Sequence, residues 1–132
     1  MATRETIPTQ AEDESLRGDV RSRISTSIVQ LHKEYYGRGP TKTKTYYQED
    51  FVLILLRGGF TTVERTLLHA GRRDAVTAQR HTFQEVMRPL YAELVERETG
   101  RPVTAFMSTT HQDPDILAEL FILEPPEGYG ED

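Results

Sequence analysis

Apolar side chains recur at helical spacing in the first third of the chain. Successive members of this set lie four, four, three and four residues apart: Val20, Ile24, Ile28, Leu31 and Tyr35. Side chains at this spacing share one face of an amphipathic helix, so the pattern predicts a helix over residues 15–36. Gly37 and Pro40 mark its end, because glycine commonly caps a helix C-terminus and proline cannot continue the helix.

The next segment predicts two strands joined by a short turn. Residues 41–47 are rich in Thr and Tyr, which are favoured in strands. Residues 48–50 are polar, and residues 51–56 read FVLILL, a continuous apolar run typical of a buried strand. Two strands that follow each other this closely form an antiparallel hairpin.

Two helices are predicted after this hairpin. The first lies within residues 61–71, with a threonine as its N-cap and a glycine as its stop. The second begins near Asp74 and carries apolar residues at helical spacing as far as residues 99–100. Pro89 is expected to kink or split this helix near Arg88, because proline removes a backbone donor and crowds the preceding turn.

The last third of the chain predicts a second hairpin. Residues 102–109, PVTAFMST, form a third strand, and residues 117–124, LAELFILE, form a fourth. Between them HQDPD, residues 111–115, reads as a turn, where proline suits the second position of a type I turn. Pro125 and Pro126 end the last strand.

The order of helix, hairpin, two helices and hairpin predicts an α+β fold. Helices would cover one face of an antiparallel sheet of about four strands. Neither face of the third strand is plainly polar, so the second sheet face needs a cover, and a homodimer would supply one. We expect residues 15–125 to form a single domain, between a disordered tail at 1–14 and an acidic tail at 126–132.

Composition narrows the class of protein. The 132 residues are 36% hydrophobic and 28% charged, and there is no cysteine, so disulfides and thiolate metal sites are excluded. The N-terminus lacks a signal-peptide core, and no apolar run is long enough to span a bilayer. The sequence therefore predicts a cytoplasmic protein, with any membrane contact peripheral. The net charge is −5, and residues 102–132 hold seven acids and no Lys or Arg.

The stretch GRGPTKTKTYY, residues 37–47, contains the first candidate site. A phosphate-binding loop follows a strand and precedes a helix, whereas this one follows a helix, whose C-terminal end repels anions. We interpret its glycines as a cap and a turn. Arg38, Lys42 and Lys44 stay candidates for contact with an anion or a partner, against the simpler view that lysines guard an exposed edge strand.

Two other stretches hold candidate residues. Arg57, Gly58 and Gly59 connect a buried strand to a helix N-terminus, where anions can bind, although two glycines at such a turn are usually steric. The HQDPD turn offers an imidazole and two carboxylates that could hold a metal or transfer protons: His111, Asp113 and Asp115. Turn formation alone explains this segment, so we predict no cofactor and no catalytic residue.

Several stretches together resemble the MpsC family, over roughly residues 20–125. The most specific are LHKEYYGRGPTKTKTY, then LRGGFT followed by VE and TL, and finally the HQDPD turn with its following strand and LEP. The family is named for a sodium-translocating, membrane-potential-generating system linked to inorganic-carbon uptake in some bacteria. The resemblance implies a non-enzymatic accessory protein that acts beside subunits of a membrane transport complex. It supplies no catalytic residue.

Two alternatives remain open. The element order also resembles a KH domain, in which a G-x-x-G loop between two helices clamps RNA. Here that position reads Gly71, Arg72, Arg73 and Asp74, and the aspartate repels phosphate, which argues against nucleic acid as a partner. The second alternative is a small metal-dependent enzyme or sensor that would use the HQDPD turn.

Overall fold

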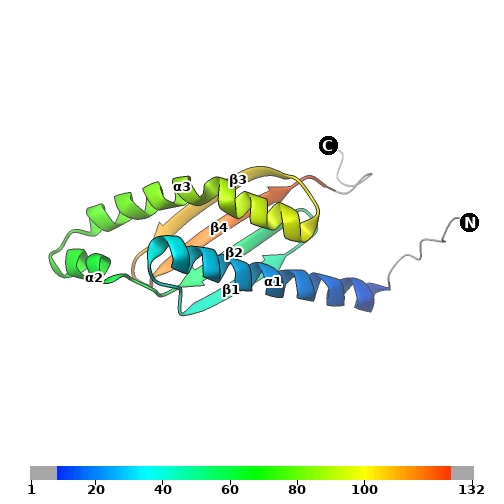
Figure 1. Cartoon of the computed structure of the whole chain (residues 1–132), viewed down its shortest axis with the longest axis horizontal. Helices are drawn as coiled ribbons and strands as arrows, with labels where there is room; N and C mark the ends of the chain where they lie inside the picture. The colour runs from blue at the N-terminus through cyan, green and yellow to red at the C-terminus, as the bar shows by residue number, and fades with distance from the viewer. Residues whose placement is uncertain (1–8, 126–132) are drawn as a thin grey trace, which may run out of the picture.

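The computed structural model describes residues 9–125, and their fold is α+β, as predicted (Figure 1). The expected tails at 1–8 and 126–132 lie outside the described residues. The elements follow in the order α1 (Gln10–Tyr36), β1 (Lys42–Tyr47), β2 (Phe51–Arg57), α2 (Thr62–His69), α3 (Arg73–Thr99), β3 (Val103–His111) and β4 (Ile116–Leu123).

Helix α1 begins five residues earlier than the apolar spacing predicts. Thr9 is its N-cap: the Thr9 hydroxyl accepts from the backbone N–H of Glu12, and the Glu12 carboxylate accepts from that of Thr9, both at 3.1 Å. This reciprocal capping box satisfies two backbone donors that would otherwise lack partners. Residues 10–14 are therefore helical, and the prediction of a disordered tail as far as residue 14 is wrong for them.

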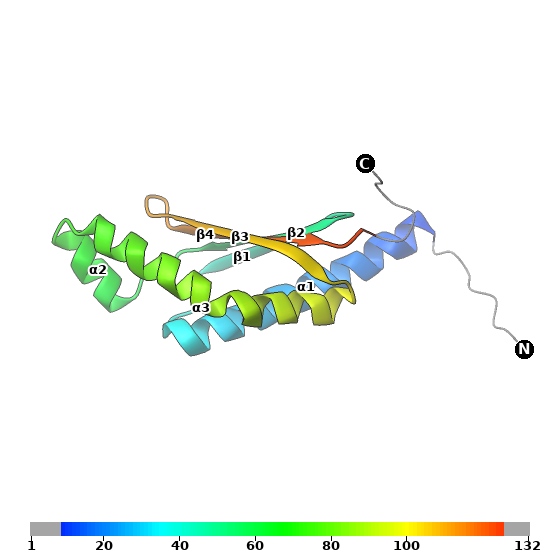
Figure 2. The same cartoon turned by 90° about the horizontal axis from the view of Figure 1, so that it is seen from above.

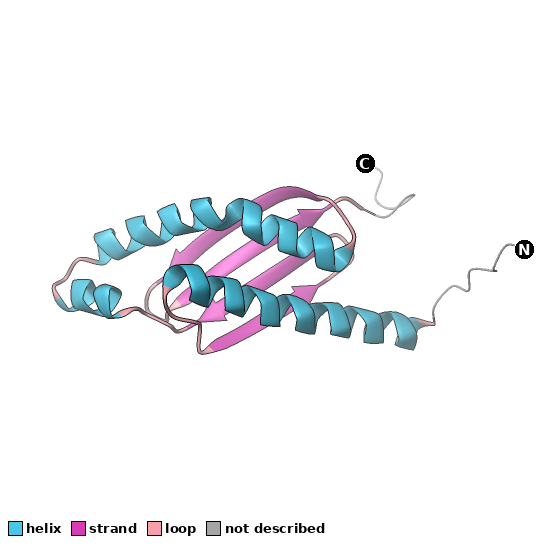
Figure 3. Ribbon diagram, viewed as in Figure 1, coloured by secondary structure: helices cyan, strands magenta, loops and turns pink. Residues whose placement is uncertain are grey.

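The four strands form one antiparallel sheet in the order β1-β2-β4-β3 (Figure 3). The two predicted hairpins are both present, and they join through β2 and β4 in the middle of the sheet. Val52 lies opposite Phe121, and Ile54 opposite Glu119. The sheet is thus built from segments that are distant in the sequence.

Helices α1 and α3 lie on the same face of the sheet, as Figure 2 shows from above. Side chains of β2 alternate between buried and half-buried, and so do those of β4. The buried set packs against the helices. Helix and strand side chains together form one core, whose largest fully buried apolar members are Ile24, Ile28, Ile54, Leu56, Met87, Tyr91, Leu94, Phe121 and Leu123.

The other sheet face, which we call the open face, carries no helix among the described residues (Figure 2). Strand alternation and register place one apolar set there: Tyr46, Phe51, Leu53, Leu55, Ala105, Met107, Ile116, Ala118, Leu120 and Ile122. Met107 is 52% exposed and Tyr46 is 40% exposed. The expectation of a second apolar face therefore agrees with the structure, while the homodimer that would cover it stays a prediction.

Two prolines show how far the local predictions reach. Pro89 lies inside α3, and the helix continues through it without a split, although its two halves run in different directions in Figure 2. In the turn between β3 and β4, the Asp113–Pro114 peptide bond is cis, a conformation that the turn prediction did not include.

Candidate functional site

One guanidinium inside the protein pairs with two carboxylates. Arg80 of α3 is 1% exposed and Glu64 of α2 is 0% exposed. Arg80 Nε donates to Glu64 Oε2 at 2.7 Å, and Nη2 donates to Glu64 Oε1 at 3.3 Å. Arg80 Nη1 donates to a carboxylate oxygen of Asp115, in the turn before β4. The contact with Glu64 is two-pronged, the geometry that a guanidinium makes best.

Further groups complete this arrangement, which we call the Arg80 cluster: Tyr36, Glu64, Arg80 and Asp115. The Tyr36 hydroxyl at the end of α1 donates to Glu64, and the backbone N–H of Thr61 donates to the same carboxylate at 2.9 Å. The Phe60 ring lies 4.5 Å from the guanidinium carbon of Arg80. The cluster thereby ties α1, α2, α3 and the β3–β4 turn together.

Hydrogen bonding keeps the cluster charged. Burial alone would raise the pKa of Glu64, but hydrogen bonds from Arg80, Tyr36 and Thr61 outweigh it and lower that pKa. For Arg80, burial opposes the charged form, and the bonds to both carboxylates raise the pKa nonetheless. Burial and the bond to Glu64 raise the pKa of Tyr36 to about 12. These groups hold each other in one protonation state, as a structural ion-pair network does.

A second buried acid has no cation. Glu119 lies in the middle of β4, faces the helices and is 1% exposed. Gln84 Nε2 donates to Glu119 Oε1 at 3.0 Å, while Glu119 Oε2 and Gln84 Oε1 have no hydrogen-bond partner. Burial raises the pKa of Glu119 to about 8, although bonds from Gln84 and Ser108 act to lower it. At neutral pH this carboxyl is therefore mostly protonated, which gives it a donor of its own.

His32 of α1 is another buried titratable group. Its ring is 2% exposed and lies edge-on to Phe83, with centroids 5.5 Å apart. Burial and the nearby charge of Arg80 lower the pKa of His32 to about 4. The imidazole is therefore neutral at physiological pH. It lies in the core with His32 Nδ1 3.4 Å from the Tyr91 hydroxyl.

The HQDPD residues do not converge on a metal. His111 Nδ1 lies 2.8 Å from the carbonyl oxygen of Pro114, Asp115 is bound by Arg80, and Asp113 is exposed. Within residues 9–125, no three His, Cys, Asp or Glu side chains are grouped so as to hold a metal ion. The segment instead provides one arm of the Arg80 cluster.

The basic candidates do gather, at one corner of the open face. Lys42 lies opposite Arg57 in the register of β1 and β2, and Lys44 follows on the same face. We call these three exposed residues the basic corner. Arg38 is also exposed, in the loop that precedes β1. The two glycines after Arg57 are required because there is no room for a side chain. A Cβ on Gly58 would lie 2.2 Å from Thr41 Oγ1, and one on Gly59 would lie 2.8 Å from a backbone oxygen.

The segment with the KH-like spacing joins α2 to α3. Gly71 follows Ala70, the C-cap of α2, and has φ of 76°, a conformation that favours glycine. Arg72 Nε lies 3.4 Å from a carboxylate oxygen of Asp74, and Arg73 is the first residue of α3. All four residues are exposed. One of the two arginines is thus already partnered by the aspartate that replaces the second glycine.

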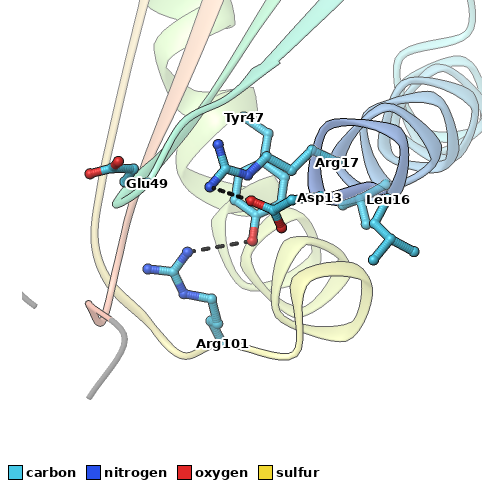
Figure 4. A pocket seen from close by; sticks show the side chains of 7 residues that line it. Asp13, Leu16, Arg17, Tyr47, Glu49 and Arg101 are labelled. Carbon is cyan, nitrogen blue, oxygen red and sulfur yellow. Dashed lines mark hydrogen bonds and ion pairs between the residues drawn. The ribbon is translucent and has the colours of Figure 1, made fainter. Parts of the chain in front are cut away.

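An open pocket of about 410 Å³ lies beside the start of α1, at the end of the sheet where the β1–β2 turn is found (Figure 4). Arg101 Nη1 donates to the Tyr47 hydroxyl at 3.4 Å, and Arg17 pairs with Asp13 at the same distance. Glu49 adds a second acid to the lining. The charges in this pocket are balanced, and the arrangement provides neither a nucleophile paired with a base nor a set of metal ligands.

Sequence reasoning missed the buried charges, although signals for them were present. Glu64 stands three residues after Thr61, the spacing of a capping box. Arg80 and Gln84 fall at helical spacing from Val76, on the stripe that faces the core. Glu119 is the lone acid among alternating apolar residues of β4. The signal for Glu64 is thus the capping box, and the signal for the others is a polar residue at a core position of an otherwise regular pattern.

Together these features define a protein built around internal polar contacts, with helices on one sheet face and an apolar surface on the other. The chain belongs to the MpsC family, described as "Na+-translocating membrane potential-generating system (MpsC)", which it matches over residues 16–125. The family resemblance seen in the sequence is confirmed.

A curated relative is the "Uncharacterized protein YbcI" of Bacillus subtilis (strain 168). It is 28% identical over 93 residues, which cover 68% of this chain and 73% of the relative. No solved structure matches the chain. Among residues 9–125 there is also no helix with the length and apolar character needed to cross a membrane.

Proposed function

We propose that this chain is a non-enzymatic accessory protein of a membrane system that translocates ions or takes up inorganic carbon. It acts as a homodimer at the cytoplasmic face of the membrane and contacts subunits of the transport complex there. The observation that carries the proposal is membership of the MpsC family over residues 16–125. The description of the family names a membrane-potential-generating system and does not name a chemical reaction.

The distribution of polar groups favours binding over catalysis. The charged side chains with the most perturbed environments, Arg80 and Glu64, are buried and bonded to each other. A catalytic acid or base must reach a substrate, and these two are both saturated and enclosed. The exposed features of the fold are instead a broad apolar sheet face and the basic corner beside it, which are features of a contact surface.

The test is a deletion in the native host, with the membrane potential measured by a voltage-sensitive dye under a sodium load. We expect the deletion to lower the potential and the wild-type gene to restore it. In parallel, the tagged chain should cross-link in vivo to a subunit of an ion-translocating membrane complex, identified by mass spectrometry. An unchanged potential together with no cross-link to a membrane transport subunit would rule the proposal out.

A further inference from the structure

The open face has an apolar centre that is continuous across three strands. In the register, Leu53 lies opposite Leu120, and Leu120 lies opposite Met107. Phe51 and Ile122 form the next pair along the same face. The side chains of β2 and β4 on this face are half-buried, because they shield one another, while Met107 is 52% exposed. An apolar surface of this kind is typical of an interaction site.

The size of this face fits a dimer. A strand spacing of about 4.8 Å and a rise of about 3.3 Å per residue give a face of four strands an area of about 500 Å². Two such faces in contact remove about 1,000 Å² from water before the relief of the side chains is counted, which is the minimum area expected of a biological interface. Two sheets packed face to face at about 10 Å are a common core.

The edges of the sheet are less suited to pairing. Edge strand β1 carries Lys42 and Lys44, which are both exposed. Edge strand β3 has a register irregularity between Val103 and Ala105. Lysines and bulges are the features by which natural sheets prevent edge-to-edge association. A second copy would therefore meet the face of the sheet and not its edge.

Charge also selects how two copies would meet. The basic corner lies at one end of the β1–β2 hairpin, and the exposed acids Glu49 and Asp50 lie at the turn at its other end. Suppose that the two-fold axis lies between the two sheets and perpendicular to the strands. Each β1–β2 hairpin then packs on the same hairpin of the other copy, with the strands of the two hairpins running in opposite directions. Each basic corner then lies over the acidic turn of the other copy, and like charges are kept apart.

We propose that the open face is covered by the open face of a second copy of this chain. The dimer then has four layers, helices–sheet–sheet–helices, with the β1–β2 hairpins of the two copies antiparallel across the interface. This inference rests on the proposed function in one respect, the homodimer. The choice of the open face and the antiparallel arrangement of the hairpins are argued from the sheet itself.

The test measures the mass of the purified full chain by sedimentation equilibrium between 1 and 100 µM. We expect the wild type to have twice the monomer mass of 15.1 kDa. Leu120→Asp, at the centre of the face, should raise the dimer Kd by about 100-fold or more, as loss of a central contact residue does. The matched control is Val86→Asp, since Val86 is 65% exposed on α3, away from the sheet; this variant should remain dimeric.

A second variant separates loss of the interface from loss of the fold. Met107→Lys changes a side chain that is 52% exposed in the single chain, so folding does not depend on it, and the variant should be monomeric with unchanged circular dichroism. The charge exchange tests the arrangement: Lys44→Glu should weaken the dimer about tenfold, and adding Glu49→Lys should restore it.

A wild-type monomer at 100 µM, or full dimerisation of both Leu120→Asp and Met107→Lys, would overturn the proposal. So would a monomer that sediments with vesicles containing 30% phosphatidylserine and loses this binding in Met107→Lys, because lipid would then be the occupant. Restoration of the membrane potential by a monomeric variant would separate the two proposals: the accessory function would stand without the dimer. If the purified chain is a dimer but the deletion leaves the membrane potential unchanged, the dimer would stand without the accessory function.

Discussion

Two glutamates, Glu64 on α2 and Glu119 on β4, are buried, and only one of them has a cation beside it. Glu64, at 0% exposure, is held by Arg80, and its pKa is lowered. Glu119, at 1% exposure, has neutral partners and no cation, and its pKa is raised to about 8. Both carboxyls are shielded from solvent, and their partners differ: the carboxyl paired with a cation stays ionised, and the one without a cation takes up a proton.

The two sites therefore respond to different disturbances. The Arg80 cluster depends on all its members, because removing one charge leaves the others buried without compensation. The pair formed by Glu119 and Gln84 is neutral at physiological pH and depends instead on a proton supplied by the solvent. We therefore expect stability to depend on the Arg80 cluster mainly when a member is mutated, and on the pair of Glu119 and Gln84 mainly when the pH changes.

Replacing Arg80 by methionine should have the largest effect. The change leaves the buried Glu64 and the partly buried Asp115 without their cation, and such a loss costs about 3–5 kcal/mol in buried ion pairs. Urea unfolding monitored by circular dichroism measures it. Arg72→Met removes an ion pair of the same type from the surface, where the cost is about 0–1 kcal/mol. A stability of Arg80→Met within 1 kcal/mol of the wild type would mean that the cluster is not an essential support.

The pH dependence of Glu119 should come next. The ordinary pKa of its carboxyl is 4.5 and the folded value is about 8, so between these values the folded chain binds the extra proton. The free energy of unfolding then falls as pH rises through this window, by an amount on the order of a few kcal/mol. Glu119→Gln, which keeps the shape of the neutral acid, should flatten the decline.

Urea midpoints measured between pH 6.5 and 8 isolate this effect from the histidines. Glu124→Gln, at an exposed site at the end of the same strand, is the control and should keep the wild-type slope. An identical slope in the wild type and Glu119→Gln would show that the carboxyl is ionised when folded, and the contrast with Glu64 would then fail.

His32 should have a smaller effect on the free energy of unfolding, and this effect should destabilise the chain as pH falls and not as it rises. Its ordinary pKa of 6.5 falls to about 4 in the folded chain, so the unfolded state binds more protons between these values. Stability is therefore lost as pH falls from 6.5 to 4, by about 1–3 kcal/mol. His32→Gln should reduce this loss, while His81→Gln, at an exposed position, should not. Direct titration by NMR that placed the His32 pKa near 6.5 would contradict the prediction.

The smallest effect is expected at the HQDPD turn. His111 is exposed and interacts only with a backbone carbonyl three residues on, so His111→Ala should change stability by less than about 0.5 kcal/mol. Addition of 100 µM Zn²⁺ should leave the melting temperature within about 1 °C, because a ligand stabilises only when its concentration exceeds Kd. A rise of several degrees that is lost in His111→Ala would restore the metal hypothesis.

The sequence predicted most of the fold because the elements have regular periods. The apolar run 51–56, the helical spacing of Ile24 and Ile28, and the glycine stops all act locally, so they can be read without the tertiary structure. The start of α1 was missed because a capping box at Thr9 depends on two polar residues, and apolar spacing does not register it.

The Arg80 cluster could not be assembled from the sequence, because its members come from four separate elements. Asp115 was noticed as part of a turn, but its partner lies on α3, and only the three-dimensional arrangement brings them together. The same holds for Glu119, whose strand position predicts burial but not the absence of a cation. The basic corner was partly foreseen, since Lys42 and Lys44 share a strand face, while the pairing with Arg57 requires the register.

The central pairing of β2 with β4 has a consequence for how the chain folds. Arg57 lies opposite Ile116, although α2, α3 and β3 stand between them in the sequence. Each hairpin can form quickly by itself, in about 1–10 µs, but a pair of strands is only marginally stable alone. The sheet must therefore wait for a contact between distant segments, and such non-local pairings slow folding towards the millisecond range and beyond. During synthesis, the first hairpin emerges well before its central partner, and the edge of β2 that pairs with β4 has no partner until β4 leaves the ribosome.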